Sequence, residues 1–345
     1  MTELPWLEDV PLFASGSAAL AELVRWGARE LGWCRVWLPS YYCPDVPAAL
    51  AAAVGRDVEL HAYPDALLWE PVHLPAAAAE PGDVVVIANQ LGVRGRPDTA
   101  AAVAAGATII EDHSHDPASA WALASTADYA FASLRKTLPI PDGGAVWSPM
   151  RRDLPPEPDA DAGADPDERG VRGSAERIAL ALADRGRQTN AGDDRLRFRS
   201  LARVAATPIA TRTPRRRISP VSRALLPQMP VHAWRERRRE NLATLSDVAA
   251  SASGVGVLDA PAGGVAFALT LVFGTAEERL TAQQRLTARA VVPTVLWALE
   301  PERDWGVSEA DADLSRRILS IHGDQRYDAA DMERLADILR EALVS

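Results

Sequence analysis

Apolar residues follow two different spacings along the first 150 positions, and their alternation predicts a sheet covered by helices. Short apolar runs of strand length occupy 35–40, 57–63, 83–89, 107–112, 128–133 and 144–149. Between the early runs, apolar residues recur at helical spacing over 17–31, 44–55 and 97–105. Strands that alternate with amphipathic helices indicate an α/β fold with a mostly parallel central sheet covered on both faces.

The second half of the chain follows a different order of elements. Helical spacing recurs over 174–185, 233–250, 275–289 and 329–343, with apolar strand-like runs over 264–273 and 291–297. We therefore expect a large α/β domain over 1–225 and a smaller α+β domain over 226–345. The stretch 151–170 is rich in Pro and Asp and lacks periodicity, so we expect a mobile acidic surface insert there.

Composition and charge argue against a nucleic-acid-binding protein, a membrane protein and a metal site. The chain has 345 residues, is 48% apolar and 24% charged, and carries a net charge of −10, so a nucleic-acid surface is not expected, even at the basic run 211–220. No apolar stretch approaches about 20 residues, and the acidic N-terminus lacks the features of a signal peptide, so we expect a cytoplasmic protein without a membrane span. Cys34 and Cys43 fit a reducing compartment, and His113 and His115 lack neighbouring ligands for a metal site.

Lys136 is the one lysine among 37 basic residues; all others are arginines. A genome that disfavours lysine codons is one explanation. However, the amine of lysine can form a Schiff base with a carbonyl, and the guanidinium of arginine cannot. The sequence therefore favours a chemical role for Lys136.

Other polar side chains are expected to lie near this lysine, because ligands in open α/β sheets bind at the carboxyl ends of the strands. Asp112 ends one predicted strand, Ser133 ends the next, and the adjacent tyrosines Tyr41 and Tyr42 follow an earlier one. In addition, 15–18 opens a helix whose free N–H groups suit a phosphate. A lysine, an acid, an aromatic plate and a phosphate cradle are the groups that pyridoxal 5′-phosphate needs.

The order of these segments resembles the DegT/DnrJ/EryC1/StrS aminotransferases, a family of fold-type I pyridoxal phosphate enzymes, of which the chain would be a small divergent member. SGSAAL resembles the family's phosphate-binding start, IIEDHSH its acidic segment, and SLRKTLPIPDGGAVW its lysine segment. The segments RRRENLATL and LSIHGDQRYDAADMERLADIL resemble the C-terminal half of small members. The resemblance therefore covers nearly the whole chain and implies the fold-type I architecture.

The resemblance also implies a role for each matching position. Lys136 would hold the cofactor as a Schiff base and then move protons at the substrate Cα, while Asp112 would pair with the pyridine nitrogen. His115 would lie near the O3′ side of the cofactor. The phosphate would be bound by Ser17, the Ala18 amide and Ser133. Tyr42 is the first choice for the stacking side chain, with Tyr41 as the second.

Some positions depart from the family pattern. Its histidine-containing segment reads ANQLGVRG here, with Asn89 where a histidine is expected. Arg94 and Arg96 follow a strand end and could clamp a carboxylate, and the candidate substrate contacts are therefore Asn89 and Arg94. The family's asparagine-bearing arm into the neighbouring subunit has no clear match; Asn190 is a loose candidate. Because members build each site at a subunit boundary, the resemblance implies a homodimer, with the run 211–220 able to reach across.

The expected activity is amino transfer from a small-molecule donor to a keto acceptor. The same residues would also suit a pyridoxal phosphate-dependent lyase, substitution or condensing enzyme, because groups around the cofactor decide which bond to Cα breaks. A non-catalytic cofactor-binding regulator is a third alternative, disfavoured because Lys136 and Asp112 are both present. The sequence does not name the substrate.

Overall fold

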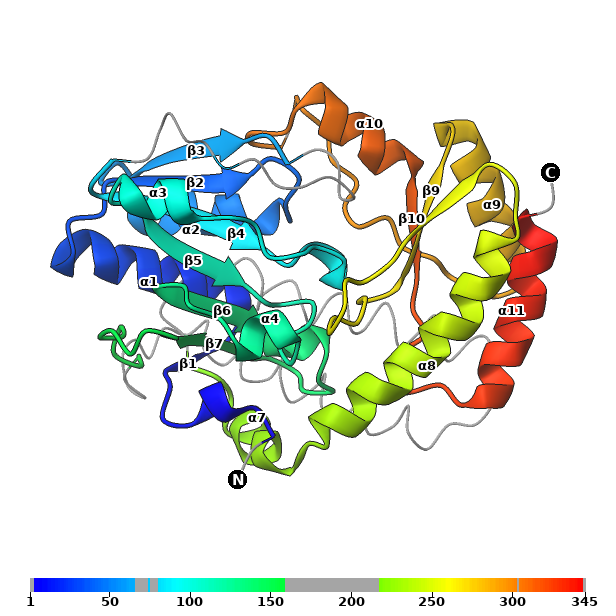
Figure 1. Cartoon of the computed structure of the whole chain (residues 1–345), viewed down its shortest axis with the longest axis horizontal. Coiled ribbons are helices and arrows are strands. Elements are labelled where there is room, and N and C mark those ends of the chain that lie inside the picture. Colours follow the sequence, from blue (N-terminus) through cyan, green and yellow to red (C-terminus); the bar gives the residue numbers. More distant parts are fainter. Residues whose placement is uncertain (1–2, 66–73, 75–79, 159–216, 303, 344–345) are drawn as a thin grey trace, which may run out of the picture.

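The computed structural model describes residues 3–65, 74, 80–158, 217–302 and 304–343. Two sheets organise this part of the chain, as Figure 1 shows, with the larger sheet on the left and the smaller one on the right. The expected helix at 174–185, the loose candidate Asn190, and most of the acidic insert and of the basic run lie outside the described residues.

The larger sheet has seven strands in the order β1-β7-β6-β5-β4-β2-β3. Their bounds are β1 Leu12–Phe13, β2 Arg35–Pro39, β3 Glu59–Tyr63, β4 Asp83–Ala88, β5 Thr108–Asp112, β6 Tyr129–Ser133 and β7 Gly144–Trp147. Strands β3, β2, β4, β5 and β6 run parallel to one another, and β7 pairs antiparallel with both β6 and β1. The expected mostly parallel sheet is therefore confirmed, and the helix-strand alternation of 17–149 is observed with boundaries shifted by a few residues.

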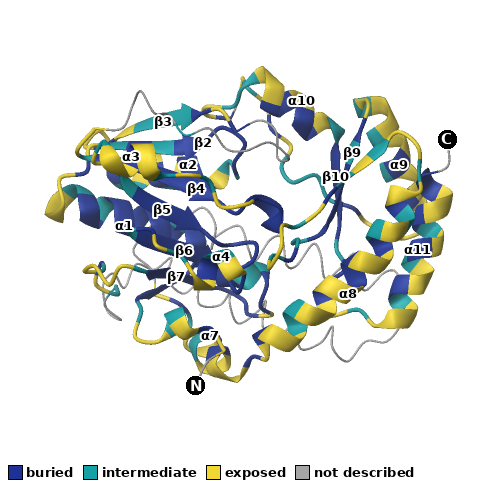
Figure 2. Ribbon diagram, in the orientation of Figure 1, coloured by how far each residue is buried: buried dark blue, intermediate teal, exposed yellow. Residues whose placement is uncertain are grey.

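Both faces of this sheet are buried, as the apolar runs predicted. Along β4, Val84 and Val86 belong to the apolar cluster shared with α1 (Gly16–Glu30) and α2 (Asp45–Val54). The alternate residues Val85 and Ile87 pack with the cluster under α3 (Ala100–Ala104). Figure 2 shows β4 and β5 as buried, α3 as mostly exposed, and α1 as buried along most of its length. Adjacent side chains point to opposite faces of a strand, so only a doubly covered strand is apolar throughout.

Two short elements close the connections next to β5 and β6: α4 (Ala120–Leu123) and the 3-10 helix η3 (Leu134–Lys136). Three more, η1 (Pro5–Leu7), α7 (Pro220–Leu225) and η4 (Leu226–Gln228), lie around the β7 edge of the sheet, where the apolar side chains of 226–234 pack on β6 and β7. A last 3-10 helix, η2 (Gln90–Gly92), follows β4. These elements place the lysine loop between the large sheet and the C-terminal half.

The smaller sheet is antiparallel, in the order β10-β9-β8, with bounds β8 Val255–Leu258, β9 Leu269–Phe273 and β10 Ile318–Ile321. Helices α8 (Val231–Ala250), α9 (Ala276–Ala288) and α11 (Ala329–Leu343) pack against it around a second apolar cluster, and α10 (Glu309–Arg317) precedes β10. Helix α9 begins with a capping box in which Thr275 and Glu278 exchange hydrogen bonds, which fixes its first turn. The helices expected at 233–250, 275–289 and 329–343 are confirmed.

The strand expected over 291–297 is wrong. This segment makes only one bridge to the small sheet, in which Thr294 and Ser320 exchange two backbone hydrogen bonds of 2.8 Å. Pro293 has no N–H with which to extend the pairing. The segment instead carries Trp297 toward Lys136, whose Nζ lies 5.7 Å from the Trp297 ring centroid.

The strand expected over 264–273 is present only in its second half, as β9. The preceding residues contact the large sheet's loops instead: Phe267 N–H donates to the Leu91 carbonyl at 2.8 Å, and Val265 N–H donates to Asp116 Oδ2 at 2.8 Å. The run is continuously apolar because its two halves are buried against different partners. The apolar pattern alone does not distinguish one long strand from this arrangement.

Candidate active site

The carboxyl ends of β2, β5 and β6 meet the start of α1 at a cleft. Its lining includes Ser15, Gly16, Ser17, Tyr42, Cys43, Asp45, Val46, Asp112, Ser114, Phe131, Ser133, Arg135 and Lys136. Five of the predicted site residues are in this set: Ser17, Tyr42, Asp112, Ser133 and Lys136. The lysine and the acid, 24 positions apart in the sequence, therefore face one common space.

The start of α1 lies against the sheet because two glycines permit it. A Cβ atom on Gly16 would come within 2.7 Å of Ser133 Cβ, and one on Gly144 would come within 2.1 Å of the Ser15 carbonyl oxygen. Real Cβ atoms do not approach other atoms so closely, so a larger residue would push the helix away. The close approach brings the first helical N–H groups next to Ser133 at the end of β6.

The N-cap of α1 is Ser15, whose Oγ accepts a 3.1 Å hydrogen bond from the Ala18 N–H. The amide of Ala18, expected to bind phosphate, is therefore already engaged in the helix cap. The Ala19 N–H donates to the Ser15 carbonyl, as in any helix. The first N–H groups, those of Gly16 and Ser17, have no intrahelical acceptor and lie at the cleft.

Asp112 is buried and held by a short chain of hydrogen bonds. Tyr42 Oη donates to Asp112 Oδ2 at 2.6 Å, and the Ser114 N–H donates to Asp112 Oδ1 at 2.8 Å. Ser114 Oγ in turn accepts from the Ser133 N–H at 2.9 Å. Burial and the neighbouring Asp112 carboxylate raise the pKa of Tyr42 well above its usual value, so Tyr42 stays a hydrogen-bond donor. Each carboxylate oxygen keeps a further lone pair for a ligand.

The two tyrosines lie in different places. Tyr42 lines the cleft and contacts Asp112, whereas Tyr41 is fully buried and donates to the Leu296 carbonyl at 2.6 Å. Burial raises the pKa of Tyr41. Tyr42 is accordingly the one of the two that is placed to contact a ligand in the cleft.

His115 lies on the far side of the lysine. Its Nδ1 accepts a 3.1 Å hydrogen bond from the Leu91 N–H, and its Nε2 lies 3.2 Å from Lys136 Nζ. Because Nδ1 accepts, the proton of the neutral ring is on Nε2, and this N–H can donate only to the uncharged amine of Lys136, because an ammonium has no lone pair. Burial, followed by the proximity of Lys136, lowers the pKa of His115 well below its usual value, so the ring stays neutral.

The two candidate substrate contacts lie outside the lining of the cleft. The Asn89 N–H donates to the Asp112 carbonyl at 2.9 Å, and Asn89 Oδ1 is buried with no hydrogen-bond partner in the described part of the chain. Arg94 is buried in an ion pair with Asp65. The charge of Arg94 is therefore neutralised within the fold by Asp65, just after β3.

Two residues near Lys136, Trp297 and Arg135, were not predicted from the sequence. Trp297 contacts both Lys136 and His115 from the C-terminal half, and its ring centroid lies 5.8 Å from that of His115. Arg135 lines the cleft beside the lysine. Its position, directly before Lys136, was the one available signal. Nothing in the local sequence could have indicated Trp297, because it is brought there by the fold of the C-terminal half.

In the part of the chain that the structure describes, no three or more His, Cys, Asp and Glu side chains are grouped so that they could hold a metal ion. None of the described helices combines the length and the apolar character that a membrane crossing requires.

No family model and no curated protein sequence matches this chain. Solved structures do match it. A DegT/DnrJ/EryC1/StrS aminotransferase from Brucella abortus superimposes with a TM-score of 0.63 at 15% identity, covering 98% of this chain and 87% of that one. DesI, crystallised in the presence of its TDP-sugar product, gives a TM-score of 0.62 at 18% identity over 99% and 82% of the two chains.

A third solved structure, 3-amino-5-hydroxybenzoic acid synthase, gives a TM-score of 0.61 at 14% identity, covering 96% of this chain and 85% of that one. These likenesses extend over nearly the whole chain, including both sheets. They confirm the architecture expected from the sequence motifs: the chain has the fold-type I fold of the DegT/DnrJ/EryC1/StrS aminotransferases.

Proposed function

We propose that this protein is a pyridoxal phosphate-dependent aminotransferase that acts on a small amino donor and keto acceptor, in the manner of specialised metabolism. The observation that carries the proposal is that Lys136, Asp112, Ser17 and Ser133 line one cleft. The fit extends to the backbone, because the glycine contacts leave the N–H groups of α1 at the cleft. When bound there, the cofactor supplies an aldehyde for the lysine and a ring that withdraws electrons from the substrate Cα.

The chain's own residues have distinct tasks in this proposal. Asp112, oriented by Tyr42 and Ser114, provides a fixed negative charge for a protonated ring nitrogen. Lys136 Nζ carries protons to and from the reacting carbon. His115 holds a neutral Nε2–H toward the lysine side of the cleft, and Trp297 covers that side and limits access of water.

Absorption spectroscopy tests the proposal directly. Protein mixed with pyridoxal phosphate should develop the visible band of the lysine-bound cofactor, and borohydride should abolish that band. Lys136→Ala should not develop it. Lys136→Arg is the matched control, because it keeps the positive charge but cannot form the Schiff base. A wild-type protein that stays colourless with excess cofactor would refute the proposal.

A half-reaction distinguishes amino transfer from other chemistry on the same cofactor. Addition of an amino donor to the loaded protein should convert the bound cofactor to pyridoxamine phosphate, and a keto acid should reverse the conversion. Steady product formation without this conversion would instead indicate elimination, substitution or condensation.

Two further properties are part of the proposal. We infer a homodimer from the family resemblance, which light scattering at working concentration would test; a monomer would contradict it.

We also infer that the domains divide near residue 226, between α7 and α8. Limited proteolysis should then yield fragments that separate at this point. Arg217, the described arginine of the basic run, pairs with Glu157 of the same chain at 2.7 Å.

A further inference from the structure

Arg135 carries a positive charge into the cleft, and no ion pair to it is found among the described residues. It belongs to η3, between Ser133 and Lys136, and lines the same space as both. Its Nε is buried and has no hydrogen-bond partner among the residues that the structure describes. A guanidinium N–H that is buried without a partner is unfavourable, because it loses its hydration and gains no hydrogen bond in return.

The two aspartates whose charges act on Arg135, Asp45 and Asp142, do not pair with it within the described residues. Asp142 is already bound by Ser219, which donates its N–H at 2.8 Å and its hydroxyl at 2.6 Å, and by the Ser222 hydroxyl. Asp45 lies at the cleft but is exposed, and within the described residues it makes no ion pair with Arg135. Burial lowers the pKa of Arg135, which is the expected response to a charge that lacks a close counterion.

The cleft that Arg135 lines also contains several hydrogen-bond donors. The N–H groups at the start of α1 and the hydroxyls of Ser17 and Ser133 lie there. The 15-residue helix α1 adds the positive end of its dipole. A guanidinium, a helix N-terminus and hydroxyls together suit a doubly charged anion such as a phosphate ester.

We propose that Arg135 is the cation that binds the phosphate group of the cofactor and makes the cleft select phosphorylated over non-phosphorylated pyridoxal. This inference rests on the proposed function for the identity of the ligand, but the anion site itself is argued from Arg135 and α1. It explains why a cation lies two residues after Ser133 and directly before Lys136: one turn of 3-10 helix places Arg135 and Lys136 at the phosphate and aldehyde ends of one ligand.

Affinity measurements on two ligands test the proposal. Dissociation constants for pyridoxal phosphate and for pyridoxal should be measured on the wild type, Arg135→Gln and Arg135→Lys, by absorbance or by quenching of tryptophan fluorescence. Arg25→Gln is the matched control, because it removes the same charge from α1 at a position paired with Glu22. Melting with and without inorganic phosphate gives a readout that involves neither the aldehyde nor catalysis.

Arg135→Gln should weaken binding of pyridoxal phosphate about 10- to 100-fold, as expected for loss of a charge-assisted hydrogen bond, and change pyridoxal affinity less than about twofold. Arg135→Lys should recover part of the loss, and Arg25→Gln should match the wild type. Phosphate should raise the melting temperature of the wild type but not of Arg135→Gln. The ligand-free variant should melt no lower than the wild type, since it loses an unpaired charge.

The outcomes separate this inference from the proposed function. Equal losses of affinity for both ligands, or none, would refute the role of Arg135 and leave the proposed function intact. Stabilisation by phosphate that requires Arg135, without binding of either pyridoxal compound, would support the anion site and refute the proposed function. The absence of all three kinds of binding would overturn both.

Discussion

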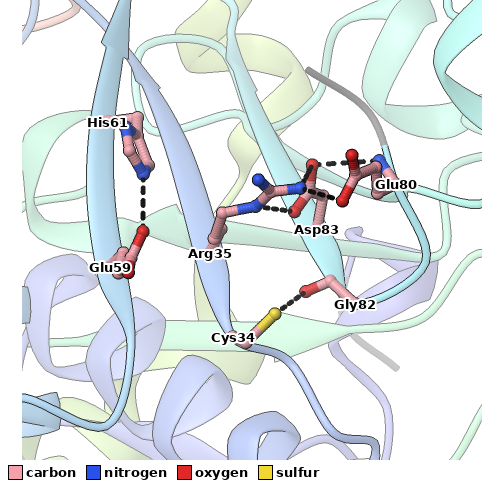
Figure 3. A network of polar contacts seen from close by, with 7 residues as sticks. All are labelled: Cys34, Arg35, Glu59, His61, Glu80, Gly82 and Asp83. Atoms are coloured by element: carbon pink, nitrogen blue, oxygen red, sulfur yellow. Dashed lines mark hydrogen bonds and ion pairs between the residues drawn. The ribbon is translucent and has the colours of Figure 1, made fainter.

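Arg35 and Arg135 lie at opposite ends of the large sheet and differ in what surrounds their guanidinium groups. Arg35, at the amino end of β2, donates to both carboxylate oxygens of Asp83, at 2.6 and 3.0 Å, and to Glu80 at 2.9 Å (Figure 3). Asp83 is completely buried and also accepts the Glu80 N–H. Arg135, at the carboxyl end of β6, has a buried Nε without a partner in the described chain.

The charges at the amino end of the sheet stabilise the fold, whereas those at the carboxyl end are suited to bind a ligand. At the amino end, donors and acceptors satisfy each other, so the charges there maintain the pairing of β2 and β4. At the carboxyl end, Arg135, Asn89 and the start of α1 retain unused hydrogen-bonding capacity inside the fold. Buried polar groups are normally paired, so such a concentration of exceptions indicates a binding site.

The largest expected effect is on activity, at the carboxyl end. Asp112→Asn keeps the shape of the side chain and removes its charge, so it should lower kcat/KM by about 100-fold or more, the usual cost of losing a preorganised electrostatic contact. Steady-state kinetics on cofactor-loaded protein would measure this. Asp83→Asn makes the same chemical change at the amino end and should leave kcat/KM unchanged; equal losses in the two variants would contradict the comparison.

Gly144→Ala should disturb the join between the sheet and α1. The new Cβ would lie 2.1 Å from the Ser15 carbonyl oxygen, so the helix must move, at a cost of about 1–3 kcal/mol in the free energy of unfolding. Because the α1 amides move with it, affinity for pyridoxal phosphate should also fall. Gly256→Ala is the control, since its Cβ would meet nothing closer than 3.7 Å. Wild-type stability and cofactor affinity in Gly144→Ala would show that the close approach is not needed.

Asp83→Asn should lower the free energy of unfolding by about 1–2 kcal/mol, because Arg35 loses its buried counterion but stays partly hydrated. Urea denaturation would measure the change. Glu59→Gln, at the exposed pair in which Glu59 lies 3.2 Å from His61 (Figure 3), should change stability by less than about 0.5 kcal/mol. If the exposed pair were worth as much as the buried one, the amino end would not be specially stabilising.

The smallest expected effect concerns pH. The folded protein keeps His115 neutral while the unfolded chain takes up a proton below its usual pKa, so acid favours unfolding at this residue. Between about pH 6.5 and 5.5 this should cost about 1 kcal/mol of stability. His115→Gln removes the titrating group and should reduce the loss by that amount in urea denaturation at the two pH values. An identical pH dependence in both proteins would mean that His115 titrates normally in the fold.

Local chemistry could be predicted wherever it depends on residues close in sequence. Ser15 caps α1, Gly55 ends α2, and the continuous apolar runs form the doubly buried strands, because periodicity and caps act within a few residues. Asp112 and Lys136 could be placed together because parallel strands end at one edge of a sheet. The same rule placed Asn89 and Arg94 near the site, but it gives no side-chain direction, and Arg94 pairs with Asp65 instead.

Predictions were weakest where one segment contacts two units. The runs 264–273 and 291–297 are apolar because each packs partly against the small sheet and partly against loops of the large sheet. Their patterns therefore resembled those of single strands. The short strands β8 and β10 were not predicted, since four residues carry too little periodicity to identify them.

The sequence by itself determined the solitary lysine, the acid that ends β5, the capped start of α1 and the order of strands and helices. These follow from local propensities and from the rule that parallel strands share one edge. The tertiary structure decided that Arg135 Nε is buried without a partner in the described part of the chain, that Tyr42 rather than Tyr41 faces the cleft, and that Trp297 reaches the lysine. Pairing and burial of a charge depend on distances between segments far apart in the chain, which no local pattern records.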